Sequence, residues 1–64
     1  MHSCTYNAVI YQENGHLIYY TKSFKSERKL FSMISSTYRI IYVSTVSRSE
    51  TSVFYRVVVD NVAP

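Results

Sequence analysis

Hydrophobic residues recur at a spacing of two near both ends of the chain, which is typical of β-strands. The first such region consists of Thr5–Gln12 and His16–Lys22, separated by a turn that contains Asn14 and Gly15. Because Asn and Gly both tolerate positive φ, we predict a two-residue hairpin loop of type I′. The resulting register pairs Tyr11 with Ile18, Ile10 with Tyr19, Val9 with Tyr20 and Ala8 with Thr21.

The middle of the chain has helical spacing instead. In the segment SFKSERKLFSMISS the apolar positions recur at intervals of three and four residues, so we predict an amphipathic helix from about Phe24 to Ser35. Ser23 or Ser26 is expected to cap its first turn. The apolar positions are Phe24, Leu30, Phe31, Met33 and Ile34.

A second hairpin is predicted at the C-terminal end. Tyr38–Ser47 and Ser52–Asp60 are rich in Val, Ile and Tyr and surround the turn sequence RSET. The predicted pairs are Ser47 with Ser52, Val46 with Val53, Tyr42 with Val57, Ile40 with Val59 and Arg39 with Asp60. The last pair joins opposite charges, which favours this register. We expect the tail Asn61–Pro64 to fray.

These elements predict a single domain, residues 1–64, of the α+β class with the order ββαββ. The expected architecture is a four-stranded, mainly antiparallel sheet with one helix packed on one face. We favour antiparallel pairing throughout, with parallel pairing of the second and third strands as the alternative.

One face of this sheet should carry no charge, because it lies under the helix. Leu30, Phe31 and Ile34 are expected to supply the helix side of the core. The uncharged sheet positions are Tyr6, Ala8, Ile10, Leu17, Tyr19, Thr21, Tyr38, Ile40, Tyr42, Ser44, Val46, Val53, Tyr55, Val57 and Val59.

The opposite face is also rich in apolar residues, with Val9 and Lys22 among its members. Monomeric proteins seldom expose so large an apolar patch, so we expect a partner to cover it. Aromatic residues and Arg are enriched at protein interfaces. The candidate protein-binding residues are Tyr11, Ile18, Tyr20, Arg39, Ile41, Val43, Phe54, Arg56 and Val58.

Composition excludes several classes of protein. Hydrophobic residues make up 47% of the chain, too many for intrinsic disorder. The four acidic residues are too scattered for a catalytic carboxylate pair, and the single glycine excludes a glycine-rich phosphate loop. His2, Cys4 and His16 lack the spacing of a zinc site, so we expect no metal and no cofactor.

The sequence also predicts where in the cell the protein is found. Cys4 is the only cysteine and cannot form a disulfide within the chain. The N-terminal residues do not resemble a signal peptide, and no segment approaches the roughly 20 apolar residues that span a bilayer. We therefore expect a soluble, cytoplasmic protein with no membrane contact.

The favoured function is a non-enzymatic protein-binding module, either a homodimer or an inhibitor-type accessory protein that uses the outer sheet face. The alternative is a small nucleic-acid-binding protein, because the net charge is +3. In that case Tyr11, Tyr20 and Phe54 would stack on bases, and Lys22, Arg39 and Arg56 would meet phosphates.

The cluster of basic residues in the segment KSFKSERK offers a further possible phosphate contact, formed by Lys22, Lys25, Arg28 and Lys29. A third possibility is a metal-independent ribonuclease that positions an RNA phosphate among Lys, Arg, His and Tyr.

Overall fold

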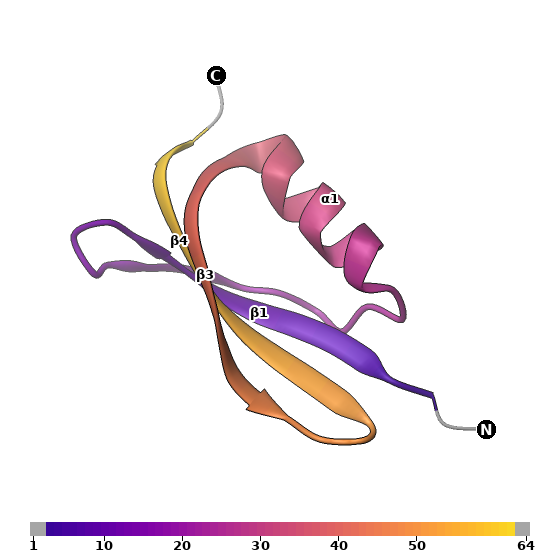
Figure 1. Ribbon diagram of the computed structural model, residues 1–64. Helices are drawn as coiled ribbons and strands as arrows, with labels where there is room; N and C mark the ends of the chain where they lie inside the picture. Colours follow the sequence, from indigo (N-terminus) through magenta and orange to yellow (C-terminus); the bar gives the residue numbers. More distant parts are fainter. Residues whose placement is uncertain (1–2, 63–64) are drawn as a thin grey trace.

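The chain forms one four-stranded sheet with a single helix on one of its faces, in a computed structural model that describes residues 3–62 (Figure 1). The predicted α+β class and element order are confirmed. The elements are β1 (Thr5–Gln12), β2 (Leu17–Tyr20), α1 (Glu27–Thr37), β3 (Tyr38–Arg48) and β4 (Ser52–Val62). Strand β1 has the predicted bounds and β2 is shorter than predicted. Strand β4 takes in two residues of the tail that we expected to fray.

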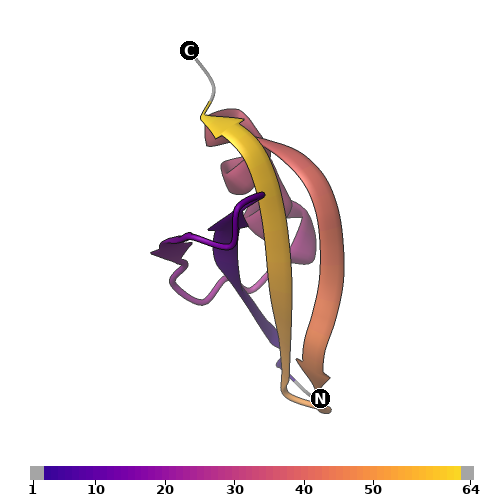
Figure 2. The ribbon, with the colours of Figure 1, turned by 90° about the vertical axis from the view of Figure 1, so that its left-hand side faces the viewer.

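The strand order in the sheet is β2-β1-β4-β3. Both hairpins are antiparallel, but β1 and β4 pair in parallel, so the expectation of an entirely antiparallel sheet is wrong. The alternative is also wrong, since β2 and β3 are the two edges and do not meet. This order places β1 and β4, which hold most of the buried aliphatic residues, at the centre, while α1 links one edge to the other across a face (Figures 1 and 2).

The loop of the first hairpin has three residues, not two. Among the described residues positive φ occurs at Gly15 alone (+90°), whereas a type I′ turn would require it at Asn14 as well. The N–H of Gln12 donates to the carbonyl of His16 at 2.8 Å, which closes the longer loop. A register shift follows, so Tyr11 pairs with Leu17 instead of Ile18, while the pairs Ile10–Tyr19 and Val9–Tyr20 are as predicted.

Helix α1 begins three residues later than predicted because Phe24 belongs to the sheet. The N–H of Phe24 donates to the carbonyl of Tyr6 at 2.8 Å, and the carbonyl of Phe24 accepts from the N–H of Tyr6 at 2.7 Å. Ser26 is the N-cap, one of the two predicted, and its hydroxyl accepts from the N–H of Lys29. The helix extends past Ser35 to Thr37, and β3 begins at the next residue.

The register of the second hairpin differs from the predicted one because β3 contains bulges. Ile40 pairs with Val59 as predicted, but register shifts lie on both sides of it and again between Thr45 and Ser47. Each extra residue in a bulge moves the following side chains to the other face. The observed pairs are Arg39–Asn61, Tyr42–Val58, Val43–Val57, Ser44–Arg56, Ser47–Phe54 and Arg48–Val53.

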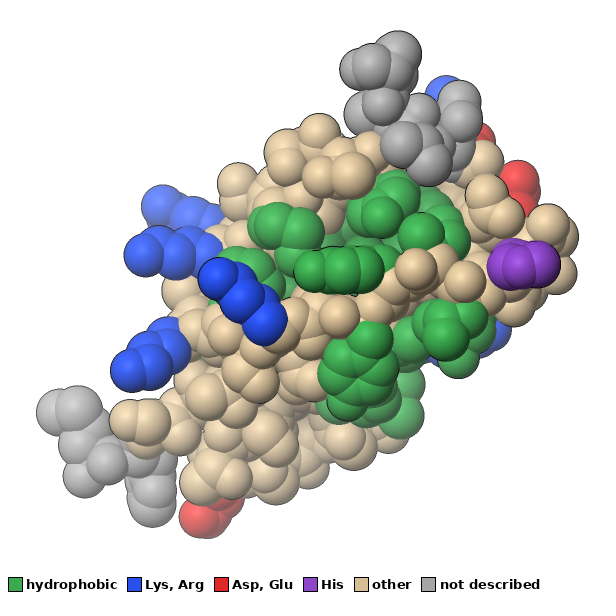
Figure 3. Space-filling model, turned by 180° about the vertical axis from the view of Figure 1, so that it is seen from behind, with side chains coloured by type: hydrophobic (Ala, Val, Ile, Leu, Met, Phe, Trp, Pro, Cys, Tyr) green, Lys and Arg blue, Asp and Glu red, His purple; other side chains and the backbone are tan. Residues whose placement is uncertain are grey.

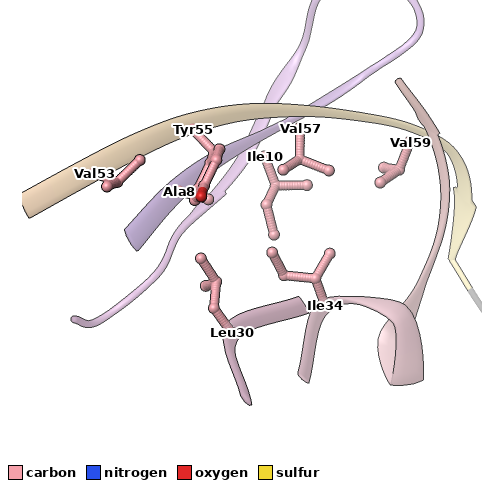
Figure 4. Packing of buried hydrophobic residues seen from close by; sticks show 8 residues of the cluster. All are labelled: Ala8, Ile10, Leu30, Ile34, Val53, Tyr55, Val57 and Val59. Atoms are coloured by element: carbon pink, nitrogen blue, oxygen red, sulfur yellow. The ribbon is translucent and has the colours of Figure 1, made fainter. Parts of the chain in front are cut away.

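The core lies between α1 and the two central strands (Figure 4). The predicted core positions on β1, β4 and α1 are confirmed for Ala8, Ile10, Leu30, Ile34, Val53, Tyr55, Val57 and Val59. Thr21 is also buried, and its hydroxyl accepts from the N–H of Ala8 at 2.9 Å. Tyr6, Phe31, Tyr38 and Ile40, which were also predicted core residues, are partly buried and pack against this cluster. The remaining predicted core positions on the edge strands are wrong, because register shifts turn some of them away from the helix and the sheet edge exposes the others. These exposed residues are Leu17, Tyr19, Tyr42 and Val46, and Ser44 pairs on the opposite face.

Candidate functional site

The face of the sheet opposite α1 has no element packed on it within the described residues. Figure 2 shows this side, with β4 in front and α1 behind the sheet. The strand registers bring five of the predicted interface residues together here, from β1, β2 and β4. We use the term open face for these five residues, Tyr11, Tyr20, Phe54, Arg56 and Val58, together with Leu17 and Tyr42.

Aromatic contacts hold the centre of the open face in place. The rings of Tyr20 and Phe54 lie with centroids 5.6 Å apart at an angle of 31°. The guanidinium carbon of Arg56 lies 4.6 Å from the centroid of the Tyr11 ring, a cation–π contact. Such contacts restrict the side-chain rotamers, a property that lowers the entropic cost of binding a protein.

The exposed apolar surface is concentrated on the edge strands. Within the described residues, every large hydrophobic side chain that is exposed belongs to β2 or β3. Tyr20 is 60% exposed and Tyr42 58% exposed. Figure 3 shows the molecule from the side opposite the view in Figure 1, the side on which β2 lies, where apolar side chains are gathered next to the basic side chains at the left. On β3 the exposed apolar side chains next to Tyr42 are Ile41, Val43 and Val46, so the edge of this strand is apolar.

Four predicted interface residues lie elsewhere or at the border of the open face. Ile18 packs against the core on the helix side, because the first hairpin shifts register. Val43 pairs with the buried Val57 but is 37% exposed, and Ile41 lies in a bulge. Arg39 does not pair with Asp60, yet its Nε lies 3.9 Å from the Asp60 carboxylate.

Sequence reasoning missed two members of the open face, Leu17 and Tyr42. For Leu17 a signal existed, since Glu13, Asn14 and Gly15 also suit a three-residue loop that ends in a glycine with positive φ. For Tyr42 the sequence contains no such signal, because the bulge in β3 cannot be recognised from the alternation of polar and apolar residues.

A second group of polar side chains lies where α1 begins. The hydroxyl of the buried Tyr55 donates to Oε2 of Glu27, and the Tyr55 ring meets Phe31 edge to face at 5.0 Å. Burial is the main reason that the pKa of Tyr55 is raised to about 12, and the hydrogen bond to Glu27 adds to it. This group fixes the start of the helix on β4.

The Tyr55 hydroxyl predicts a pH dependence of stability. An unfolded Tyr titrates near pH 10, so the folded chain retains a proton that the unfolded chain has lost between pH 10 and about 12. The contribution is complete below pH 10 and is lost as the pH rises through the folded pKa. We expect Tyr55→Phe to remove this component from urea unfolding measured as a function of pH. The exposed Tyr19→Phe variant is the control, and an unchanged slope in Tyr55→Phe would contradict the assignment.

The four residues of the predicted basic cluster are all exposed, and we call them the basic patch. Lys22 and Lys25 lie in the loop between β2 and α1, and Arg28 and Lys29 lie in the first turn of α1. None of the four forms an ion pair with another described residue. The Nζ of Lys22 lies 5.4 Å from the centroid of Phe24.

The described residues contain no group of three His, Cys, Asp or Glu side chains able to hold a metal. Cys4 is a free, half-buried thiol just before β1. Within residues 3–62 no helix is long and apolar enough to cross a membrane. Comparisons with protein-family models, with curated proteins and with solved structures found no match, so the functional interpretation depends on the geometry of the chain itself.

Proposed function

We propose that this chain is a non-enzymatic protein-binding module that associates with a second copy of itself through the open face and the neighbouring edge of β3. The observation that carries the proposal is the placement of the exposed large hydrophobic residues, which among the described residues all lie on the edge strands. The surface of α1 is free of such residues, which indicates that the sheet and its edges, and not the helix, are the surface a partner covers.

The edge of β3 supports self-association. Strand β3 has 11 residues and ends the sheet, so its outward backbone groups have no strand partner among residues 3–62. Proteins usually protect such an edge by short length, by Pro or by charged side chains. The opposite edge, β2, has only four residues, whereas the segment 40–47 of β3 contains neither charge nor Pro.

A second copy fits this surface because it carries little uncompensated charge. Arg39 lies 3.9 Å from the Asp60 carboxylate and Arg56 lies over the Tyr11 ring, so Arg56 is the one cation of the open face without an acidic partner among the described residues. A two-fold dimer sets the same patch against itself, which an uncharged segment tolerates. A chain of 64 residues also gains from burying additional apolar surface, since a single small core gives only a few kcal/mol.

The test is the molar mass by light scattering at concentrations from about 10 to 500 µM, a range in which a dimer responds to mass action. We expect twice the 7.5 kDa mass of the chain, with dissociation on dilution. A constant 7.5 kDa mass over the whole range would overturn self-association. The partner of the open face would then have to be a different protein, as it is for an inhibitor.

A further inference from the structure

We propose that the basic patch, Lys22, Lys25, Arg28 and Lys29, binds the phosphate backbone of nucleic acid without reading its sequence. This inference is independent of self-association, because the patch lies on the helix side and the open face on the other side of the sheet. All four side chains are exposed, and Lys and Arg side chains gather at the left of the view in Figure 3.

The positive charge of this patch is only partly offset within the described part of the domain, because four cations stand beside one acid, Glu27. Glu27 is the one acid in the first turn of α1, and its carboxylate accepts a hydrogen bond from Tyr55. No described ion pair involves any of the four cations. The N-terminal end of a helix is itself positive, so Arg28 and Lys29 add to its field instead of offsetting it. Placing cations there lowers the stability of the helix, and an anionic ligand would reverse that effect.

The chemistry of the patch suits phosphates better than a protein or a lipid surface. Lys is depleted at protein interfaces, and three of the four cations are Lys. A bilayer surface is bound most firmly when apolar side chains insert, but α1 exposes no large hydrophobic residue. Beyond the patch the exposed surface of α1 carries hydroxyls, with Ser32 one turn after Arg28, and hydroxyls commonly contact phosphates.

The basic patch does not recognise bases. The rings of Tyr11, Tyr20 and Phe54 lie on the open face, away from the basic patch, and contact other side chains. Contacts limited to phosphates position nucleic acid and carry no sequence information. Affinity should therefore depend on salt and not on sequence.

The experiment is fluorescence anisotropy of a labelled DNA duplex of mixed sequence at increasing salt. Four phosphate contacts predict a slope of about −3.6 in log K against log salt, so affinity should fall roughly 100-fold between 50 and 200 mM salt. Lys25→Gln should reduce the magnitude of the slope by about 1. Arg48→Gln removes the same charge outside the patch and should leave the slope unchanged.

Two fourfold variants test whether positive charge at these positions, and not the identity of the side chains, carries binding. Replacing all four cations by Gln should abolish binding, whereas exchanging every Lys for Arg and Arg28 for Lys should preserve it. Equal effects of Lys25→Gln and Arg48→Gln would overturn the proposal, as would no binding at low salt. Binding to vesicles rich in phosphatidylserine that equals or exceeds binding to DNA would assign the patch to a lipid surface and would also overturn it.

Discussion

Leu30→Ala is expected to remove about 3 kcal/mol of the free energy of unfolding, the typical cost of truncating a fully buried Leu. Leu30 and Ile34 are the two fully buried residues of α1, and both point at the sheet in Figure 4. A domain of 64 residues is stable by roughly 3 to 10 kcal/mol. The variant should therefore be partly or largely unfolded, as measured by circular dichroism during urea titration.

The matched control is Leu17→Ala, the same truncation on an exposed edge. Leu17 is 56% exposed, so we expect a loss below about 1 kcal/mol. Equal losses in the two variants would mean that α1 does not close the core as the structure shows. A small loss for both would point to a core held mainly by the sheet.

The sequence was sufficient to predict the central strands and the buried side of the helix. In β1 and β4 the uncharged positions alternate without interruption. The two-residue period of a strand is therefore enough to place Ile10 and Val57 on the face that packs against the helix. In α1, Leu30 and Ile34 are four residues apart and necessarily share a face. The basic patch was also predictable, because its residues are neighbours in the chain.

The edge strands could not be predicted to the same degree. The side of the sheet to which Ile18 points depends on whether the first loop has two or three residues. The two loops differ in one hydrogen bond, which joins Gln12 to His16 in the structure. The face of Tyr42 depends on a bulge that only packing against β4 selects. Strand order was not encoded locally either, since the parallel pair β1–β4 joins segments more than 40 residues apart.

Tyr42 is the residue at which the proposed self-association should be most sensitive to mutation. It is 58% exposed, belongs to the open face and lies on β3 between two bulges, so it joins both parts of the proposed interface. Tyr42→Asp would place an unpaired carboxylate in a dry contact, which costs more than the lost ring alone. We expect the dimer to weaken by about 30-fold or more, so that light scattering gives the monomer mass at concentrations where the wild type is dimeric.

Ser32→Asp is the matched control because it adds the same charge on the exposed surface of α1. It should leave the molar mass unchanged. Both variants should retain the circular dichroism spectrum of the folded chain, since neither side chain is part of the core. A dimer that persists in Tyr42→Asp would exclude the open face and the β3 edge from the contact. A dimer that dissociates equally in both variants would show that net charge, and not this surface, controls association.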